Sequence, residues 1–269
     1  MSEKPVRHIL SLSGGKDSTA LAIYLRDRIP DLEYVFCDTD KELPETYEYL
    51  DRVEAYLGQP IVRLRNDGRG FDHHLILRRG YLPSPRMRWC TQQLKIRPYE
   101  RYVGDDSVLS YIGIRADEDR QGYISRKRNI TPVYPLKDDG LVKADVFRLL
   151  ESSGLGLPRY YEWRSRSGCY FCFFQQRIEW VGLLENHPEL FEAAKSYERY
   201  GEGENCFTWV ESESLEELER PERVAQIRAE HARRMARQER AIANRSLLDL
   251  FSDTIEAWQI EMGCTICEI

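Results

Sequence analysis

Long apolar segments are absent from this sequence of 269 residues. No run approaches the roughly 20 apolar residues that a membrane-spanning helix needs, and residues 1–5 lack the pattern of a secretory signal peptide. Internal repeats are absent as well. A basic excess is also missing, because 45 acidic residues outnumber 39 basic ones and give a net charge of −6. We therefore expect a cytoplasmic protein with no membrane partner, in which any nucleic-acid contact is confined to a local basic patch.

Apolar runs alternate with helical patterns over the first half of the chain. The expected strands are 8–12, 32–38, 61–64 and 108–114. This alternation is typical of an α/β fold with a mainly parallel, doubly wound sheet that helices cover on both faces. Beyond about residue 138 the strand signal fades, and the expected helices include 177–184, 189–200 and 214–243, the last interrupted at Pro221. We expect a nucleotide-binding domain over 1–155 and a helical C-terminal region over 156–269.

The most informative segment is the loop Ser13-Gly14-Gly15-Lys16-Asp17-Ser18, between an expected strand and an expected helix. Its glycines let the backbone approach an anion closely, and the helix start offers N–H groups at the positive end of a dipole. Its serines add hydroxyl donors and its lysine adds a point charge. A Walker A loop is excluded, because Ser11 stands where the first glycine should be and an aspartate follows the lysine. The loop predicts a phosphate-binding site.

The hexapeptide resembles the PP-loop, SGGxDS, of the ATP pyrophosphatases and their relatives. This resemblance implies that the protein binds ATP with Mg²⁺, cleaves it between the α- and β-phosphates and adenylates an acceptor. Lys16 and the loop amides would stabilise the leaving pyrophosphate, and Asp17 would help to hold the metal or the loop geometry.

Two further segments resemble the sulfonucleotide reductase branch of the same superfamily. Residues 37–46 are similar to its DTGxExPET segment, which implies that Asp38 and Thr39 contact the adenosine half of the nucleotide; Asp40 replaces the family glycine. The alternative is a helix start that Thr39 or Asp40 caps.

The second segment, residues 113–120, resembles the glycine–arginine element of that branch. The resemblance implies that Gly113, Arg115 and Arg120 belong to the nucleotide site, where both guanidinium groups would face phosphate or sulfate oxygens. For either arginine, and above all for Arg120, an ordinary surface position is the alternative.

The seven cysteines are too many to ignore in a compartment where structural disulfides are rare. Related sulfur-transfer enzymes combine a lone cysteine, here Cys90, with a later C-x-x-C, here Cys169 and Cys172. This likeness implies a [4Fe-4S] cluster on Cys90, Cys169, Cys172 and Cys206; zinc on the same residues, a dithiol, a disulfide switch and simple burial are the alternatives. A second C-x-x-C, Cys264 and Cys267, would relay sulfur, complete the metal site or take no part. Cys37 is expected in the core of its strand.

Arginine is concentrated near the C-terminus. Residues 220–245 contain eight arginines and only three acidic residues. A basic helix of this kind either lies along the phosphate backbone of DNA or RNA or is simply a solvated face. Arg164 and Arg166 are expected to add to that surface.

Taken together, the motifs from Ser13 to Cys172 resemble the PP-loop family near the phosphoadenylyl-sulfate reductases. The nearest resemblance is to reductase-like proteins of phage, mobile elements and defence loci, including those of DNA phosphorothioation systems and those found beside some CRISPR systems. The first hypothesis is an ATP pyrophosphatase in sulfur transfer, with a sulfur donor such as a cysteine desulfurase. The second is a sulfonucleotide reductase that releases sulfite, although its Glu-Cys-Gly-Leu-His tail is missing. The third is a non-catalytic adenine-nucleotide sensor in a defence complex.

Overall fold

The computed structural model describes residues 5–66, 68–119, 126–198 and 207–243. The chain divides into two compact units. The first holds the described residues up to His74 together with the described part of Met87–Cys169, and the second holds Leu75–Arg86 and the described residues from Tyr170 to Ala243. Residues 160–167 belong to the first unit and bond to the loop that follows β1. No helix in the described part is long and apolar enough to cross a membrane.

Five parallel strands form the sheet of the first unit, in the order β3-β2-β1-β4-β5. Their bounds are β1 Arg7–Leu12, β2 Leu32–Cys37, β3 Ile61–Leu64, β4 Val108–Tyr111 and β5 Ile130–Val133. The strand order reverses beside β1, and in open α/β sheets the crevice at the carboxyl ends of such strands is where ligands bind. The expected parallel α/β fold is confirmed.

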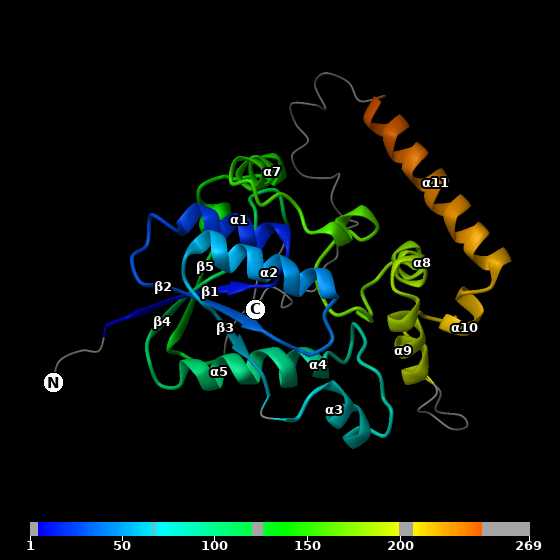
Figure 1. Cartoon of the computed structure of the whole chain (residues 1–269), viewed down its shortest axis with the longest axis horizontal. Coiled ribbons are helices and arrows are strands. Elements are labelled where there is room, and N and C mark those ends of the chain that lie inside the picture. Colours follow the sequence, from blue (N-terminus) through cyan, green and yellow to red (C-terminus); the bar gives the residue numbers. More distant parts are fainter. Residues whose placement is uncertain (1–4, 67, 120–125, 199–206, 244–269) are drawn as a thin grey trace. The chain divides into compact units, whose positions relative to one another are not determined.

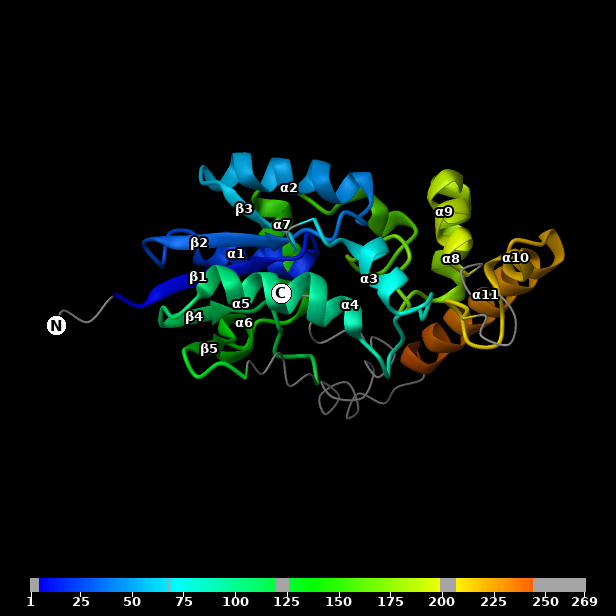
Figure 2. The same ribbon diagram turned by 90° about the horizontal axis from the view of Figure 1, so that it is seen from below.

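Helices cover both faces of this sheet. They are α1 Lys16–Leu25, α2 Pro44–Leu57, α4 Trp89–Thr91, a π-helical turn η1 Gln92–Ile96, α5 Arg97–Val103, α6 Pro135–Asp138, α7 Lys143–Ser152 and a 3₁₀ turn η2 Arg159–Glu162. In Figures 1 and 2, α1, α2 and α7 lie on one side of the strands and α5 on the other. α3, Phe71–Leu77, runs from the first unit into the second.

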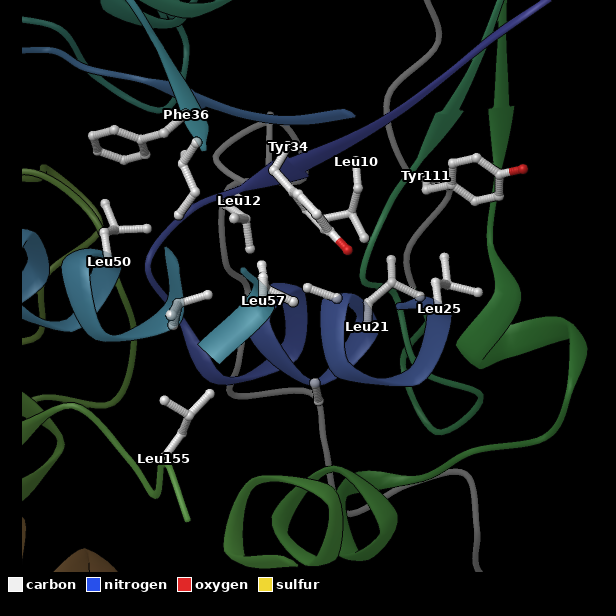
Figure 3. Close-up of a cluster of buried hydrophobic side chains, with 14 of the residues drawn as sticks. Leu10, Leu12, Leu21, Leu25, Tyr34, Phe36, Leu50, Leu57, Tyr111 and Leu155 are labelled. Atoms are coloured by element: carbon white, nitrogen blue, oxygen red, sulfur yellow. The ribbon is translucent and has the colours of Figure 1, made fainter. Parts of the chain in front are cut away.

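The two cores follow from the period-2 alternation of the strands. Leu10 and Leu12 of β1 point to the face that packs on α1, α2 and α7 (Figure 3). Ile9, just before Leu10, points to the opposite face and packs with residues of α5 and η1. Because both faces are buried, the strands read as continuous apolar runs.

The second unit is helical where it is described. Its elements are α8 Arg177–Asn186, α9 Pro188–Glu198, α10 Leu215–Leu218 and α11 Pro221–Ala243. Its core is aromatic: Phe171 stacks on Trp209 with ring centroids 4.9 Å apart, and Trp180 lies 6.3 Å from Trp209. Two backbone N–H groups, of Trp209 and Leu215, donate to the buried carboxylate of Glu198. This carboxylate fixes the start of α10, and burial raises its pKa.

Candidate nucleotide-binding site

The loop after β1 has the tight geometry that its glycines predict. Gly14 has φ of +71°, a left-handed conformation, and a Cβ there would lie 2.6 Å from Cγ2 of Thr46. A Cβ at Gly15 would lie 2.7 Å from Oγ of Ser167. Neither position can take a larger residue without displacing its neighbour. α1 begins at Lys16, and no side chain caps its N-terminus, so its first turn suits an anionic ligand.

The two serines of the loop bond to the loop itself. Ser18 Oγ accepts from the backbone N–H of Ser13 at 3.1 Å and donates to the carbonyl of Gly15 at 3.3 Å. Ser13 Oγ and Ser18 Oγ are 3.1 Å apart. In the described contacts these hydroxyls hold the loop in shape, and their predicted contact with phosphate stays a prediction.

Three residues far along the chain cover the loop. Tyr160 Oη donates to the carbonyl of Gly14 at 2.8 Å, and the backbone N–H of Lys16 donates to Tyr161 Oη at 3.2 Å. Ser167 Oγ bonds to Ser13 Oγ at 3.2 Å. Burial raises the pKa of both tyrosines, so both stay protonated at neutral pH. Sequence reasoning missed these contacts, because no local pattern indicates that residues 160–167 return to the loop.

Lys16, Asp17 and Arg115 form a buried charged cluster with Asp117 and Glu118. Asp17 Oδ2 lies 3.2 Å from Lys16 Nζ, and Asp17 Oδ1 lies 2.6 Å from a guanidinium nitrogen of Arg115. The same guanidinium contacts Asp117 at 2.9 Å and Glu118 at 2.6 Å, and Arg115 is only 1% exposed. Burial alone would lower the pKa of Arg115, but the carboxylates of Asp17 and Glu118 raise it.

This cluster changes the interpretation of Arg115. The sequence predicts that its guanidinium faces an anionic ligand, whereas its described contacts are with carboxylates. Arg115 thus contacts Asp17, which also contacts the ammonium group of Lys16, and the predicted contact of Arg115 with a nucleotide stays a prediction. Each Asp17 oxygen already contacts one cation, Lys16 or Arg115. Bound Mg²⁺ would therefore be held mainly by phosphate oxygens and water, as is common for this ion. Arg120 lies outside the described residues.

Gly113 follows β4 and lies directly against the first turn of α1. A Cβ at this residue would come within 2.9 Å of backbone atoms of Asp17 and Ser18. Its role in the structure is close packing of β4 on the loop, and contact with a nucleotide stays a prediction.

Asp38, at the carboxyl end of β2, is buried in a polar network. It accepts hydrogen bonds from Arg65 at 2.6 and 3.0 Å, from the hydroxyl of Tyr47 at 2.8 Å and from the backbone of Asp40 at 2.9 Å. Asp40 has φ of +59°, so it adopts the left-handed conformation that a glycine would take more easily. Adenosine, if it contacts Asp38 as predicted, would have to share the carboxylate with these donors.

The alternative role for this segment, a side-chain helix cap, is wrong. α2 begins at Pro44, its N-cap residue is Leu43, and no side chain caps it. Thr39 Oγ1 instead donates to Glu42 Oε1 at 2.9 Å. Proline at the first position needs no N–H partner, which makes a cap less necessary.

Comparison with known proteins identifies the family. The model of the phosphoadenosine phosphosulfate reductase domain matches residues 7–172. The chain belongs to this family. The match covers the loop, Asp38, Arg115 and both cysteines of the first C-x-x-C motif.

Individual relatives of this reductase-domain protein share less than a third of its residues over the matched regions. An uncharacterised protein of Methanocaldococcus jannaschii is 28% identical over 204 residues, which are 71% of this chain and 40% of that protein. An uncharacterised protein of Escherichia phage 186 is 26% identical over 258 residues, covering 71% of this chain and 74% of the phage protein. The chain thus spans less than half of the archaeal relative. Among solved structures, a phosphoadenylyl-sulfate reductase from Candida auris in complex with phosphate is similar to this chain, with a TM-score of 0.47 and 15% sequence identity. The match covers 62% of this chain and 82% of the Candida auris chain.

The cysteines of the family match have different surroundings. Cys37 is buried in β2, as expected, and burial raises its pKa to about 12. Cys169 Sγ lies 3.2 Å from Thr39 Oγ1 and donates to Glu42 Oε1 at 3.7 Å. Its thiol therefore lies at the carboxyl end of β2, beside the predicted nucleotide contacts.

The predicted metal ligands are only partly described. Cys90 and Cys169 belong to the first unit, and Cys172 belongs to the second. Cys206 and the tail cysteines Cys264 and Cys267 lie outside the described residues. Within the described ranges no group of three or more histidine, cysteine, aspartate or glutamate side chains could hold a metal ion. The residue types suit a cluster or zinc, and the metal centre stays a prediction.

Arg164 does not belong to a basic surface, which corrects the sequence expectation. It is buried, and its guanidinium donates to the carbonyls of Gly168 at 3.0 Å and Cys169 at 2.8 Å. An arginine at this position fixes the backbone that leads into the C-x-x-C motif.

Proposed function

We propose that this protein is an ATP pyrophosphatase that adenylates an acceptor in a sulfur-transfer pathway. The observation that carries the proposal is the loop after β1, where the N-cap residue Gly15 brings no side-chain cap and Lys16 is buried. This arrangement supports a phosphate site at the carboxyl edge of the sheet. Membership of the reductase-domain family supports chemistry on an adenine nucleotide that is connected with sulfur.

The charges of the site suit cleavage between the α- and β-phosphates. Negative charge grows on pyrophosphate as it leaves, and the Lys16 ammonium group and the amides of α1 would stabilise it. Asp17 and Arg115 would hold Lys16 in place through their ion pairs of 3.2 and 2.6 Å. Bound Mg²⁺ would neutralise further phosphate charge.

Sulfur would reach the adenylated acceptor from the cysteine side of the site. Cys169 lies beside Thr39 and Glu42 at the carboxyl end of β2, and Cys90, Cys169 and Cys172 would be the thiolate ligands of a [4Fe-4S] cluster or of zinc. A cluster with three protein ligands would supply an open iron for sulfur. A nucleic acid, as in DNA phosphorothioation, is our preferred acceptor. Metal analysis and a visible spectrum after anaerobic purification test the cluster.

Pyrophosphate release from ATP and Mg²⁺ tests the proposal directly. Lys16→Ala removes the charge at the leaving group, and Asp17→Asn weakens the ion pair that holds it. We expect each variant to lose at least 100-fold in turnover. Lys137→Ala, at an exposed lysine of α6, is the matched control and should keep the wild-type rate. Turnover that is unchanged in Lys16→Ala would contradict the assignment.

A sulfonucleotide reductase is the second candidate, and the family match itself favours it. Thiol-dependent release of sulfite from adenylyl sulfate or its 3′-phosphate would support this reaction. Sulfite release without pyrophosphate release from ATP would replace our first proposal with this one.

A further inference from the structure

A pocket with a largely apolar wall and several polar side chains lies within the second unit, between the start of α8 and one face of α11. Its volume is 380 Å³, and the lining side chains that matter here are Gln175, Ile178, Val210, Ile227, His231 and Arg234. On α11, residues 227, 231 and 234 follow the i, i+4, i+7 spacing of one helix face. Ile227 is buried and anchors that face, which places the two polar residues at the pocket.

One cation of this pocket lacks a carboxylate partner in the described part of the chain. Arg234 donates to Gln176 Oε1 at 2.5 Å and lies 3.2 Å from His231 Nδ1, and neither partner is a carboxylate. The other cation, Arg177, is already paired with Glu213 at 2.7 Å. The one carboxylate on the wall, Glu230, lies 3.6 Å from Arg223. Arg234 therefore gives the pocket a positive charge that an anionic group could neutralise.

Gln175 is an independent sign of a ligand. It is only 8% exposed, and neither its amide nitrogen nor its amide oxygen has a hydrogen-bond partner among the described residues. A buried amide without partners costs free energy. Its terminal torsion is soft, so the amide can turn toward an occupant of the pocket. A glutamine amide offers one donor and one acceptor side by side, which matches the edge of adenine.

The remaining wall suits the flat face of a base. Ile178, Val210 and Ile227 contribute apolar surface, against which the face of an unpaired base can pack. The cation, the amide and the apolar wall together match the phosphate, the base edge and the base face of one nucleotide.

A row of exposed arginines continues away from this pocket along α11. Arg237 and Arg240 follow Arg234 at intervals of three residues and are exposed, so each lies about 4.5 Å further along the helix axis. A mononucleotide would leave this row unused, whereas a strand would bring successive phosphates to it. We propose that the pocket binds one unpaired nucleotide, preferably adenine, of a single-stranded nucleic acid whose backbone follows α11. This proposal stands independently of ATP cleavage at the other site.

Fluorescence anisotropy with labelled eight-nucleotide homopolymers tests the proposal on the full chain without ATP. We expect wild-type protein to bind dA8 or rA8 more tightly than dT8 or rU8 at about 50 mM salt, with RNA and DNA arms showing which sugar is preferred. Arg234→Ala should weaken binding of all strands about tenfold and reduce the slope of log K against log salt by about 0.7, the loss of one phosphate contact. Gln175→Met, which keeps the volume but removes the amide, should abolish the adenine preference and leave the salt slope unchanged.

Arg148→Ala is the matched control, because Arg148 is an exposed helical arginine in the first unit; it should bind as wild type does. Absence of binding by wild type, or equal binding by wild type, Arg234→Ala and Gln175→Met, would overturn the proposal. So would displacement of the strand by AMP at equal concentration, since that indicates a mononucleotide site. Arg234 is exposed, so we expect Arg234→Ala to fold. If Gln175→Met does not fold, Arg234→Ala alone still tests whether the pocket binds the strand. None of these outcomes would contradict ATP cleavage at the loop after β1, because the binding experiment contains no ATP.

Discussion

At the scale of single residues, Arg115 shows how a family motif can carry a different role from the one its chemistry suggests. A guanidinium is well suited to phosphate, yet here it is buried among Asp17, Asp117 and Glu118. Removing a charge from such a cluster leaves carboxylates buried without compensation. We propose that the residue positions Asp17 and, through it, Lys16.

Arg115→Lys separates this role from direct phosphate binding. A lysine keeps the charge but cannot contact three carboxylates in the fork geometry of arginine, so Asp17 should lose its orientation. We expect kcat for pyrophosphate release to fall at least tenfold while KM for ATP changes less than threefold. Steady-state kinetics measure both. A large rise in KM with unchanged kcat would instead indicate that Arg115 binds the phosphates.

Arg115→Met is the companion variant for stability. It leaves the buried carboxylates without a cation, and we expect a loss of about 3–5 kcal/mol in the free energy of unfolding. Urea titration measures this loss. A variant as stable as wild type would show that the cluster does not depend on the guanidinium.

At the scale of elements, the sequence predicts what local chemistry decides. The strands near residues 8–12, 32–37 and 61–64 follow from apolar periodicity and are where they were expected. The glycine turn after the first strand is also present, but the helix begins at Lys16, inside the segment expected as a loop. β5, Ile130–Val133, is harder to recognise, because it contains a proline and carries few apolar residues. As an edge strand it tolerates that proline. The π-helical turn Gln92–Ile96 and the cover of residues 160–167 depend on contacts distant in sequence, which no local pattern contains.

Ion pairs on Glu213 join α8 and α11 beside α10, and their contribution to stability should depend on pH. Arg223 and Arg177 both bond to Glu213, and the hydrogen bond from Arg223 is the main reason that the pKa of Glu213 lies below its ordinary value of 4.5. The lowered pKa means that this ion pair stabilises the fold above about pH 4.5 and is lost as the pH falls through the folded-state pKa.

Glu213→Gln should therefore be destabilising at neutral pH and nearly neutral in acid. We expect a difference in the free energy of unfolding on the order of 1 kcal/mol at about pH 7, closing toward zero near pH 3. Urea titrations at several pH values measure it, with Glu211→Gln, an exposed neighbour, as control. A difference that grows on acidification would contradict the sign of the shift.

At the scale of the whole molecule, the candidate nucleotide site and the proposed nucleic-acid pocket lie in different units. Each site is built from residues of its own unit, so each should respond to its own ligand. The family match ends at residue 172, close to where the first unit ends. What is specific to this chain beyond the family therefore lies mainly in the second unit.

ATP with Mg²⁺ should stabilise the first unit by mass action. At a nucleotide concentration 100 times Kd the gain is about 2.7 kcal/mol, which corresponds to a rise in Tm of roughly 5–10 °C for a unit of this size. Differential scanning calorimetry measures the shift, and Lys16→Ala should greatly reduce it. An equal shift in that variant would locate ATP away from the loop.

The contact between Gly15 and Ser167 has a consequence for sequence change over time. Any side chain at residue 15 would collide with the serine hydroxyl, since a Cβ there would lie 2.7 Å from it. The two positions are separated by most of the family domain, yet residue 15 can gain a side chain only if the hydroxyl of residue 167 is lost or moves away. A substitution of Gly15 is therefore acceptable only after a change at residue 167 has made room for it.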